Sequence, residues 1–508
     1  RFIKFHPFYL AKQNMHKNNF FKIFLLLLFV VLIACRKDQL LTDSSAKLNF
    51  SEDTVLFDTV FASIGSTTQY LLVYNDHNRP IKISSIKLAG GSSSPFRMNV
   101  DGVAANSLND VEIRAKDSLW IFIEVTIDPT SDQTPFIVTD SIIFETNGNI
   151  QDVDLVAYGR NARFITPKYA ITFPDGSGLP YSIIGDGSPC GTVIEWDSLL
   201  PYVVYGYAVV DSCLTLKINP GTKIYFYNNS GLWVYRYGNL QVEGNLEHPV
   251  LFTGSRLESS YSEVPNQWDR IWINEGGTNK INYAIIKNGL FGVQAEDVQF
   301  DGIIGDAPTQ LTLSNSTIRN MSIGLLARSF NITAYNNVIS DCKSYCTVFS
   351  QGGTYNLKQN TIANYWRYSQ RSTPAFFMND FVNDGSSNVH IPLNINVDNC
   401  IIYGNNDNEI EKDLLDSLAD TYSFKNNLIK VDEKTTPISV IPAFINTLKN
   451  QDPLFEDQSK YNFNLKDNSP AIDAGDGSLL TFPELNTDLN GGTRPQGAAP
   501  DLGAIEKK

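Results

Sequence analysis

The sequence contains few of the features that mark membrane-spanning, nucleic-acid-binding or zinc-binding proteins. Its longest apolar run falls within 13 uncharged residues, positions 23–35, whereas a helix needs about 20 residues to span a bilayer. Lysine and arginine total 40 against 54 acidic residues, and no basic cluster offsets the net charge of −14, so a nucleic-acid partner is not expected. Histidine is scarce: of five residues only His248 and His390 follow position 100, so neither a zinc site nor any other cofactor is predicted.

What the sequence does contain favours a folded, strand-rich protein. Aromatic residues make up 12% of the chain and glycine occupies 34 positions. A chain of 508 residues is too long for one ordinary core, so two or more domains are expected.

The N-terminal region predicts export and lipid anchoring. Residues 1–14 precede Met15 and are interpreted as an upstream start outside the fold. Residues 15–35 combine a basic start with a short apolar core, as signal peptides do. The core ends in Leu-Ile-Ala-Cys, which resembles the bacterial lipobox, and this resemblance implies that Cys35 is acylated and attached to the outer membrane or cell surface. Residues 36–50 are then a tether, and the chain's end at Lys508 leaves no room for a C-terminal secretion domain. The alternative is a plain secretory signal with a chance cysteine.

Five cysteines remain after Cys35 is assigned to the lipid. In an oxidising compartment Cys190 and Cys213 are expected to form a disulfide. Cys342 and Cys346 have the spacing of half a metal site, but no histidine lies near them in the sequence. The pairing of these two residues and of Cys400 stays open.

Residues 51–162 indicate an antiparallel sandwich. Seven strand-like runs lie between Thr54 and Ala157, separated by turn-forming clusters: TVLFDTVF, YLLVYN, IKISSIKL, VEIR, LWIFIEVTI, SIIFET and VDLVA. In one run every second residue is apolar, at Val153, Leu155 and Ala157, and Asp152 and Asp154 occupy two of the other positions. The phrases FRMNVDG, KDSLWIFIEVTIDP and ETNGN…VAYGRNA resemble the hydin-like immunoglobulin domains of Bacteroidetes surface proteins. That resemblance implies a spacer or adhesion module without chemistry of its own.

A repeat dominates residues 214–450, after a lead-in segment at 163–213. Ile318, Ile339 and Ile362 recur in similar phrases after 21 and 23 residues, which predicts one solenoid coil with three short strands per repeat. Aligned repeats place five residues at one corner, where an asparagine is expected to take a left-handed bend and hydrogen-bond its copy in the next coil: Ser316, Asn337, Asn360, Cys400 and Asn427. The pattern resembles the right-handed parallel β-helix of the pectin-lyase-like fold.

Residues 451–508 match the terminal block of bacterial surface β-helix proteins. The matching phrases are DPLF, YNFNL, SPAIDAG, DLNGGTRP and PDLGAIE. We expect this block to cap the last coil and cover its open strand edge, which would otherwise pair with other chains.

The sequence indicates the function less closely than the fold, because β-helices of this type include pectate lyases, polygalacturonases, alginate-modifying enzymes, adhesins and scaffolds. The repeats contain no adjacent carboxylate pair of the kind that hydrolysis needs. Asp341 and Asp398 with Lys343 or His390 have the residue types of a calcium-dependent lyase, but their spacing does not place them on one face. No catalytic residue and no metal ligand is therefore predicted.

Aromatic residues point instead to a binding surface. Trp233, Tyr235 and Tyr237 are two apart and would share one face of a strand. The interval from Ile362 to Ile402 is 40 residues, and this insertion opens with Trp366, Arg367 and Tyr368, whose rings and guanidinium suit a sugar ligand. The alternatives are that the first rings are buried and that the insertion covers a seam between coils.

The sequence thus predicts a non-catalytic binding or scaffold surface. Polysaccharide is the favoured ligand and a surface protein is the other candidate. A polysaccharide lyase or glycoside hydrolase is the alternative function.

Overall fold

The computed structural model describes residues 39–130, 135–275, 277–297, 309–383, 385–415, 420–434 and 443–507, and its main elements are β-strands. The chain forms two compact units, the first from the residues up to Asp128 with Phe136–Gly159, the second from Arg160–Lys508 with Pro129–Pro135. Within the described residues, no helix is long and apolar enough to cross a membrane. The predicted signal peptide and Cys35 lie outside the described residues.

The first unit consists of two five-stranded sheets, in which neighbouring strands such as β3 with β8 and β9 with β10 are antiparallel. One sheet contains, in order, β1 (Asn49–Phe50), β3 (Gln69–Tyr74), β8 (Ser118–Val125), β5 (Phe96–Val100) and β6 (Val103–Ala104). The other contains β2 (Thr54–Phe61), β10 (Asn149–Arg160), β9 (Phe136–Thr146), β4 (Ile81–Leu88) and β7 (Ser107–Ile113). The predicted alternation is present, since Val153, Leu155 and Ala157 are fully buried in the core, whereas Asp152 and Asp154 are exposed.

The predicted tether at 36–50 is wrong over the part that the structure describes. Ala46 and Leu48 are buried in the core of the first unit. The side chain of Gln151 accepts from the backbone nitrogen of Leu48 at 3.0 Å and donates to its carbonyl at 2.9 Å. Apolar residues and satisfied backbone groups therefore hold this segment on the unit.

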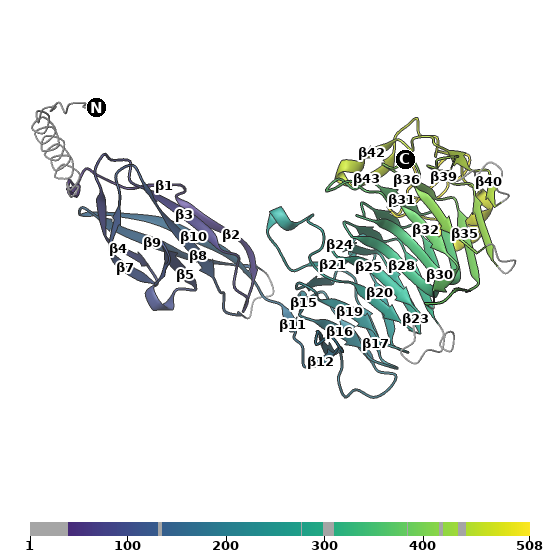
Figure 1. Ribbon diagram of the computed structural model, residues 1–508, viewed down its shortest axis with the longest axis horizontal. Coiled ribbons are helices and arrows are strands. Elements are labelled where there is room, and N and C mark those ends of the chain that lie inside the picture. Colours follow the sequence, from purple (N-terminus) through teal and green to yellow (C-terminus); the bar gives the residue numbers. More distant parts are fainter. Residues whose placement is uncertain are drawn as a thin grey trace, which may run out of the picture. The chain divides into compact units, whose positions relative to one another are not determined.

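The second unit is a stack of parallel strands that pair in three ladders (Figure 1). Ladder 1 contains β13 (Gly178–Ile183), β16 (Tyr207–Val210), β19 (Gly231–Val234), β22 (Ile271–Asn274), β25 (Phe291–Glu296), the first parts of β28 (Ile323–Tyr335) and β30 (Tyr345–Lys358), β32 (Phe376–Asn379) and β37 (Ile410–Asp413). Ladder 2 contains β14 (Val193–Trp196), β17 (Thr215–Ile218), β20 (Asn239–Glu243), β23 (Thr278–Asn282), β26 (Gln310–Ser314), the second parts of β28 and β30, β35 (Leu393–Asp398), β38 (Thr421–Lys425) and β40 (Phe444–Ile445).

Ladder 3 completes each coil. It contains β11 (Arg163–Ile165), β15 (Tyr202–Val204), β18 (Lys223–Phe226), β21 (Val250–Gly254), β24 (Ala284–Lys287), β27 (Thr317–Arg319), β29 (Val338–Ser340), β31 (Thr361–Asn364), β36 (Ile401–Gly404), β39 (Leu428–Ile429) and β41 (Leu448–Lys449). In this ladder Ile318, Ile339, Ile362 and Ile402 lie opposite one another. The sequence repeat is therefore the period of the stack.

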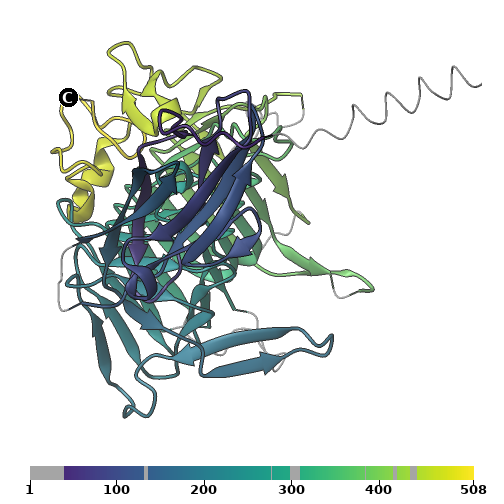
Figure 2. The same cartoon turned by 90° about the vertical axis from the view of Figure 1, so that its left-hand side faces the viewer.

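The stack begins earlier than the sequence predicts. β14 and β16 pair in parallel with β17 and β19 of the following coil, so residues 163–213 are part of the stack and not a separate lead-in. The blue hairpin of β12 (Tyr169–Thr172) and β13 extends from this end of it (Figure 2).

The predicted corner column is present. The side-chain oxygen of Asn337 accepts from the backbone nitrogen of Ser316, and that of Asn360 accepts from the backbone nitrogen of Asn337, both at 3.0 Å. Cys400 replaces asparagine in the next coil, and its backbone nitrogen donates to Asn427 at 2.7 Å. The left-handed bend lies one residue earlier than predicted, at positions with φ between 48° and 55°: Asn315, Asn336, Gln359, Asn399 and Asn426. The column residue points inward, so its predecessor turns the chain.

The C-terminal block lies along the outer side of ladder 3, beside β31 and β36 (Figure 1). It contains the antiparallel pair β42 (Phe455–Asp457) and β43 (Asn462–Leu465), followed by two short 3-10 helices, η5 (Gly477–Thr481) and η6 (Pro483–Leu485). Its apolar residues pack on those that face outward from several coils: Val338, Ala363, Ile401 and Leu428. The block therefore covers the side of the stack. The sequence predicts instead that it caps the last coil and covers the open strand edge there.

Candidate functional site

The outer face of ladder 1 carries an aromatic and polar surface. Along each strand the side chains alternate, so Leu232, Ile271 and Val293 enter the core while their neighbours Trp233, Trp272 and Gln294 point outward. Because the strands are in register, these outward residues form a row across successive coils.

The two tryptophans of this row stack on each other. Their ring centroids are 4.7 Å apart and the rings are nearly parallel, at 12°. Trp233 is only 4% exposed, because Tyr207 and Val209 also pack against it, whereas Trp272 is half-buried. Trp272 is thus the tryptophan that an external ligand can reach.

The predicted aromatic trio at 233–237 does not form one exposed face. Trp233 is covered and Tyr235 is half-buried against it, whereas Tyr237 is 42% exposed. β19 ends at Val234, and Tyr237 has a φ of 60°, so the chain has turned the corner before the third ring. The period-two alternation that the prediction assumes ends with the strand.

Fixed polar groups surround Trp272. Arg270 donates twice to Asp269, both at 2.9 Å, and once to Gln294, whose amide donates to Glu296 at 2.9 Å. Glu296 also accepts from Trp272 Nε1 at 2.6 Å.

Arg328 completes the network. It donates to Glu296 at 3.1 Å and keeps 39% of its side chain exposed. We call this surface the tryptophan–arginine face, formed by Tyr235, Arg270, Trp272, Gln294, Glu296 and Arg328. A ring beside pre-positioned donors and acceptors suits a sugar, which has an apolar face and a rim of hydroxyls.

A cavity of about 590 Å³ lies on the outer face of ladder 3 near its N-terminal end. Lys223 and His248 line it together with Leu251 and Ile285. Arg160 and Lys223 give its lining two cationic groups and Glu247 gives it one carboxylate, so it is a second place where a polar ligand could bind.

In the second predicted ligand site, Trp366–Arg367–Tyr368, the first ring is covered, whereas Arg367 and Tyr368 are exposed and each donate a hydrogen bond to another part of the unit. Trp366 is 6% exposed, and its Nε1 donates to Ser369 at 2.9 Å. Arg367 donates to the carbonyl of Ser459 in the C-terminal block at 2.7 Å, and the Tyr368 hydroxyl donates to the carbonyl of Glu263 at 2.5 Å. The predicted stacking on Trp366 is wrong, because other groups cover its ring.

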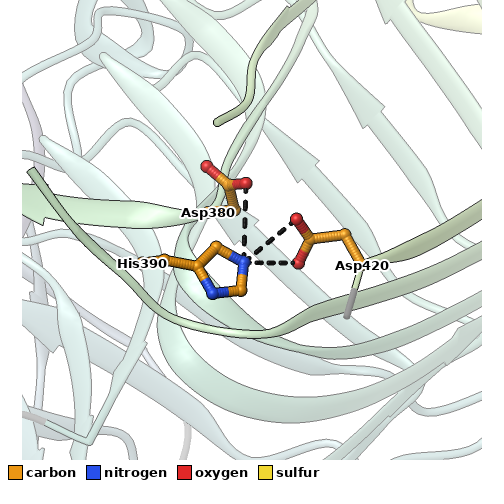
Figure 3. Close-up of side chains that lie close together, drawn as sticks. All are labelled: Asp380, His390 and Asp420. Atoms are coloured by element: carbon orange, nitrogen blue, oxygen red, sulfur yellow. Dashed lines mark hydrogen bonds and ion pairs between the residues drawn. The ribbon is translucent and has the colours of Figure 1, made fainter. Parts of the chain in front are cut away.

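A cluster of two carboxylates and an imidazole lies at the base of the hairpin β33 (Phe381–Asn383) and β34 (Asn388–His390) (Figure 3). His390 Nε2 is 2.9 and 3.0 Å from the carboxylate oxygens of Asp420 and 3.7 Å from Asp380 Oδ2. Asp380 also accepts from the backbone nitrogen of Leu415, at 3.0 Å for each oxygen, and Asp420 accepts from that of Leu393 at 2.9 Å.

The two carboxyl groups of this cluster differ in acidity. Burial, with Asp420 close by, raises the pKa of Asp380. Burial alone would also raise the pKa of Asp420, but hydrogen bonds from Leu393, Asp380 and His390 hold it below its ordinary value. These are the residues in the described part of the chain whose donor atoms are grouped closely enough to hold a metal ion.

The residue types of a calcium-dependent lyase that the sequence contains, Asp341 and Asp398 with Lys343 or His390, do not form one site in the structure. Asp341 follows ladder 3 and Asp398 ends a strand of ladder 2, so they lie at different corners of the coil. His390 faces Asp380 and Asp420 instead. The residues Asp341 and Asp398 therefore do not form one calcium site.

Of the cysteines, Cys190 and Cys213 form a disulfide with a Cα–Cα distance of 5.3 Å. Cys342, Cys346 and Cys400 are free and buried. Burial raises the pKa of Cys346 and of Cys400, and the latter value is about 12, so neither thiol is ionised at neutral pH.

No family model matches the chain, and no curated protein matches it significantly. Among solved structures, the catalytic unit of the GH87 α-1,3-glucanase from Streptomyces thermodiastaticus is similar over 71% of this chain and 84% of its own, with 11% identity and a TM-score of 0.27. A family 123 glycoside hydrolase from Clostridium perfringens is 10% identical, with a TM-score of 0.17, and the match covers 23% of this chain and 27% of that protein. A PapD-like domain of human CEP192 is 8% identical over 25% of this chain and 94% of that domain, with a TM-score of 0.18. Because these TM-scores are low, no property of these proteins is transferred to the chain.

Proposed function

We propose that the chain is a cell-envelope lipoprotein whose second unit binds polysaccharide without cleaving it. In this proposal the first unit is an immunoglobulin-like spacer, and the three ladders form a right-handed parallel β-helix covered by the C-terminal block. Three strands per coil and parallel pairing throughout the ladders support the β-helix assignment.

The tryptophan–arginine face is the observation that carries the binding role. Four of its residues, Trp272, Gln294, Glu296 and Arg328, lie on strands, while Arg270 directly precedes one and Tyr235 directly follows one, so most of its groups are held in place before a ligand arrives. Parallel strands are about 4.8 Å apart, so a row that crosses several coils matches an extended, repeating ligand. Trp272 supplies the stacking surface, and Arg328 supplies the exposed forked donor. A flat patch on a surface protein is the other ligand class that this face could take.

The bonding of the carboxylates favours binding over cleavage. Asp269 accepts from Arg270 and Tyr207, and Glu296 accepts from three donors. A glycosidase needs one carboxyl group at the scissile oxygen and a second across the bond. Groups that are already saturated with donors are poor candidates for either role.

One observation favours the enzymatic alternative, a polysaccharide lyase or glycoside hydrolase. Asp380 and Asp420 have pKa values shifted in opposite directions, as paired acids and bases do. Their side chains, however, are 0% and 5% exposed, and His390 Nε2 pairs with both. A sugar chain does not reach them, so we prefer the binding role.

The binding role is tested by titrating acidic and neutral glycans into wild-type protein and into Trp272→Ala and Arg328→Gln variants. Each change should weaken binding about fivefold, because each removes roughly 1 kcal/mol of contact, and the double variant should lose about thirtyfold. Arg328 is partly exposed, so Arg328→Gln should keep the unfolding midpoint near that of wild type. Lys223→Ala in the ladder 3 cavity is the matched control. If only the Lys223→Ala control lost glycan binding, the ligand would bind in the ladder 3 cavity and not on the tryptophan–arginine face.

Lipid anchoring rests on the Leu-Ile-Ala-Cys sequence at Cys35. Cys35→Ala should shift the protein from the membrane fraction to a soluble or unprocessed form. Membrane retention of the variant, with cleavage at another position, would refute the anchor.

A further inference from the structure

The three side chains of the Asp380–His390–Asp420 cluster come from two successive coils. Asp380 directly follows β32, and His390 is the last residue of β34, so these two flank the inserted hairpin. Asp420 directly precedes β38 in the next coil. All three lie at the corner between ladders 1 and 2, where the insertion leaves the stack.

The protein contacts leave this cluster electrostatically incomplete. Two carboxylates lie side by side with almost no exposure, and one imidazole, 26% exposed, is the only group with basic character that the structure pairs with them among the described residues. Buried charges are stable only when partners of the opposite sign compensate them. One imidazole carries at most one positive charge, so at least one of the two carboxylates needs a further positive charge to compensate it.

The geometry points to a bound divalent cation: we propose that Asp380, His390 and Asp420 together ligate one transition-metal ion, with zinc as the best match. The donor atoms lie within 4.8 Å of one another. Two ligands about 2.1 Å from a tetrahedral zinc ion lie about 3.4 Å apart. The distances from His390 Nε2 to Asp420, 2.9 Å, and to Asp380, 3.7 Å, bracket that value.

The choice of ion follows from the donors. One imidazole nitrogen with two carboxylates is a set that zinc accepts, whereas calcium takes six to eight oxygen ligands and magnesium favours oxygen. Three protein ligands leave one position of a tetrahedral ion for water. Binding replaces any proton on Nε2 with the metal and cancels the charge of both carboxylates.

Such an ion would fasten the insertion to the stack. Asp380 and His390 hold the two ends of the hairpin, and Asp420 belongs to the coil beyond it. Metal binding should therefore stabilise both the insertion and the contact between its coil and the next one.

The test uses the purified full-length protein after EDTA treatment and dialysis. Titration with ZnCl₂, followed by calorimetry and metal analysis, should give one equivalent of zinc per chain and a higher unfolding temperature. In Asp420→Asn the side-chain carbonyl can still accept from the backbone nitrogen of Leu393. In His390→Gln the new side chain is polar and of similar length. Each should weaken zinc binding at least about tenfold and remove the thermal shift. His248→Gln, which changes the histidine of the ladder 3 cavity, should change neither quantity.

Two further measurements distinguish this site from zinc binding elsewhere in the chain. Zinc held by the free thiols would survive in Asp420→Asn and disappear in Cys342→Ser/Cys346→Ser, which would overturn the proposal. No binding to the wild-type protein, or binding of calcium in preference to zinc, would also overturn it. If a variant does not fold, the absorption spectrum of cobalt-loaded wild-type protein decides: nitrogen and oxygen ligation supports the site, and sulfur ligation contradicts it.

Discussion

Asp341 occupies a buried position at a corner where the neighbouring coils have asparagine. It follows Ser340, which pairs with Arg319 and Ala363, so Asn320 and Asn364 are its counterparts. Its two carboxylate oxygens have no hydrogen-bond partner among the described residues. Burial raises the pKa of Asp341 to about 6, although Ser340 and nearby arginines oppose the shift.

The charge on Asp341 should therefore destabilise the fold at neutral pH. Because the folded pKa exceeds the unfolded value, its contribution is most favourable below the unfolded pKa and is lost as the pH rises through about 6. Asp341→Asn should raise the free energy of unfolding by roughly 3 kcal/mol at pH 7.5 and by almost nothing at pH 4. Urea denaturation of both proteins at the two pH values measures this. An equal gain at both would show that charge is not the cause.

At Trp366 the two interpretations of the insertion, a sugar-binding ring and a buried structural ring, predict different effects of a substitution. Trp366→Ala removes a buried ring and should cost about 3 kcal/mol or more of unfolding free energy while glycan binding stays unchanged. Tyr368→Phe is the control, since it removes only the bond to Glu263 and should cost about 1 kcal/mol. Denaturation curves and glycan titrations on the same preparations measure both effects. Lost glycan binding in a fully stable Trp366→Ala protein would support a sugar site at this position.

At the scale of elements, the C-terminal block contains a buried ion pair. Arg494 Nε donates to Glu506 at 2.9 Å with both side chains almost fully buried, and Arg494 also donates to Asn336 of the stack at 2.7 Å. Burial lowers the pKa of Arg494 and raises that of Glu506. The pair thus joins two of the phrases quoted for the block, DLNGGTRP and PDLGAIE, to a corner of ladder 3.

Breaking this pair should release the block. Arg494→Met leaves Glu506 buried without its cation and should cost about 3 to 5 kcal/mol. The double variant Arg494→Met/Glu506→Gln has no lone charge and should regain much of that loss. Urea denaturation, together with proteolysis of the block, measures the result. A single variant as stable as wild type would show that the block is held by its apolar contacts alone.

The elements that the sequence predicts well are those whose pattern is local. β2 and β4 coincide with their predicted runs, because alternating apolar residues bounded by turns need no distant partner. The repeat of Ile318, Ile339 and Ile362 likewise corresponds directly to the ladder register. β5 is not among the predicted runs, although Phe96, Met98 and Val100 alternate with Arg97 and Asn99 and are buried, so its pattern could have indicated a strand.

The sites are harder to predict, because they depend on contacts between coils. Trp272 is not among the predicted site residues, although Arg270, Trp272 and Asn274 alternate along one segment and could have indicated an outward face. Asp380 and Asp420 are 40 positions apart, and no spacing motif joins them to His390. Their proximity follows from the insertion, whose path the sequence does not reveal.

At the scale of the whole molecule, the proposed binding role requires a stack of parallel strands that presents one ordered face to a polymer. The tryptophan–arginine face is part of the sheet, so its affinity should rise with glycan length until the chain spans the row. Oligosaccharides of increasing length from the preferred glycan should therefore bind progressively more tightly to wild-type protein, as calorimetry measures, and Trp272→Ala should reduce that gain. An affinity that does not depend on length would place the ligand in a single pocket.

Binding without cleavage is tested most directly by incubating wild-type protein with the polysaccharide that it binds best and following both retention and chain length. We expect the protein to retain the polymer while the size distribution of the polymer stays unchanged and no unsaturated or reducing ends appear. Asp380→Asn and Asp420→Asn variants should give the same result. Progressive shortening of the polymer by wild-type protein, abolished in either variant, would contradict the binding role and establish an enzyme.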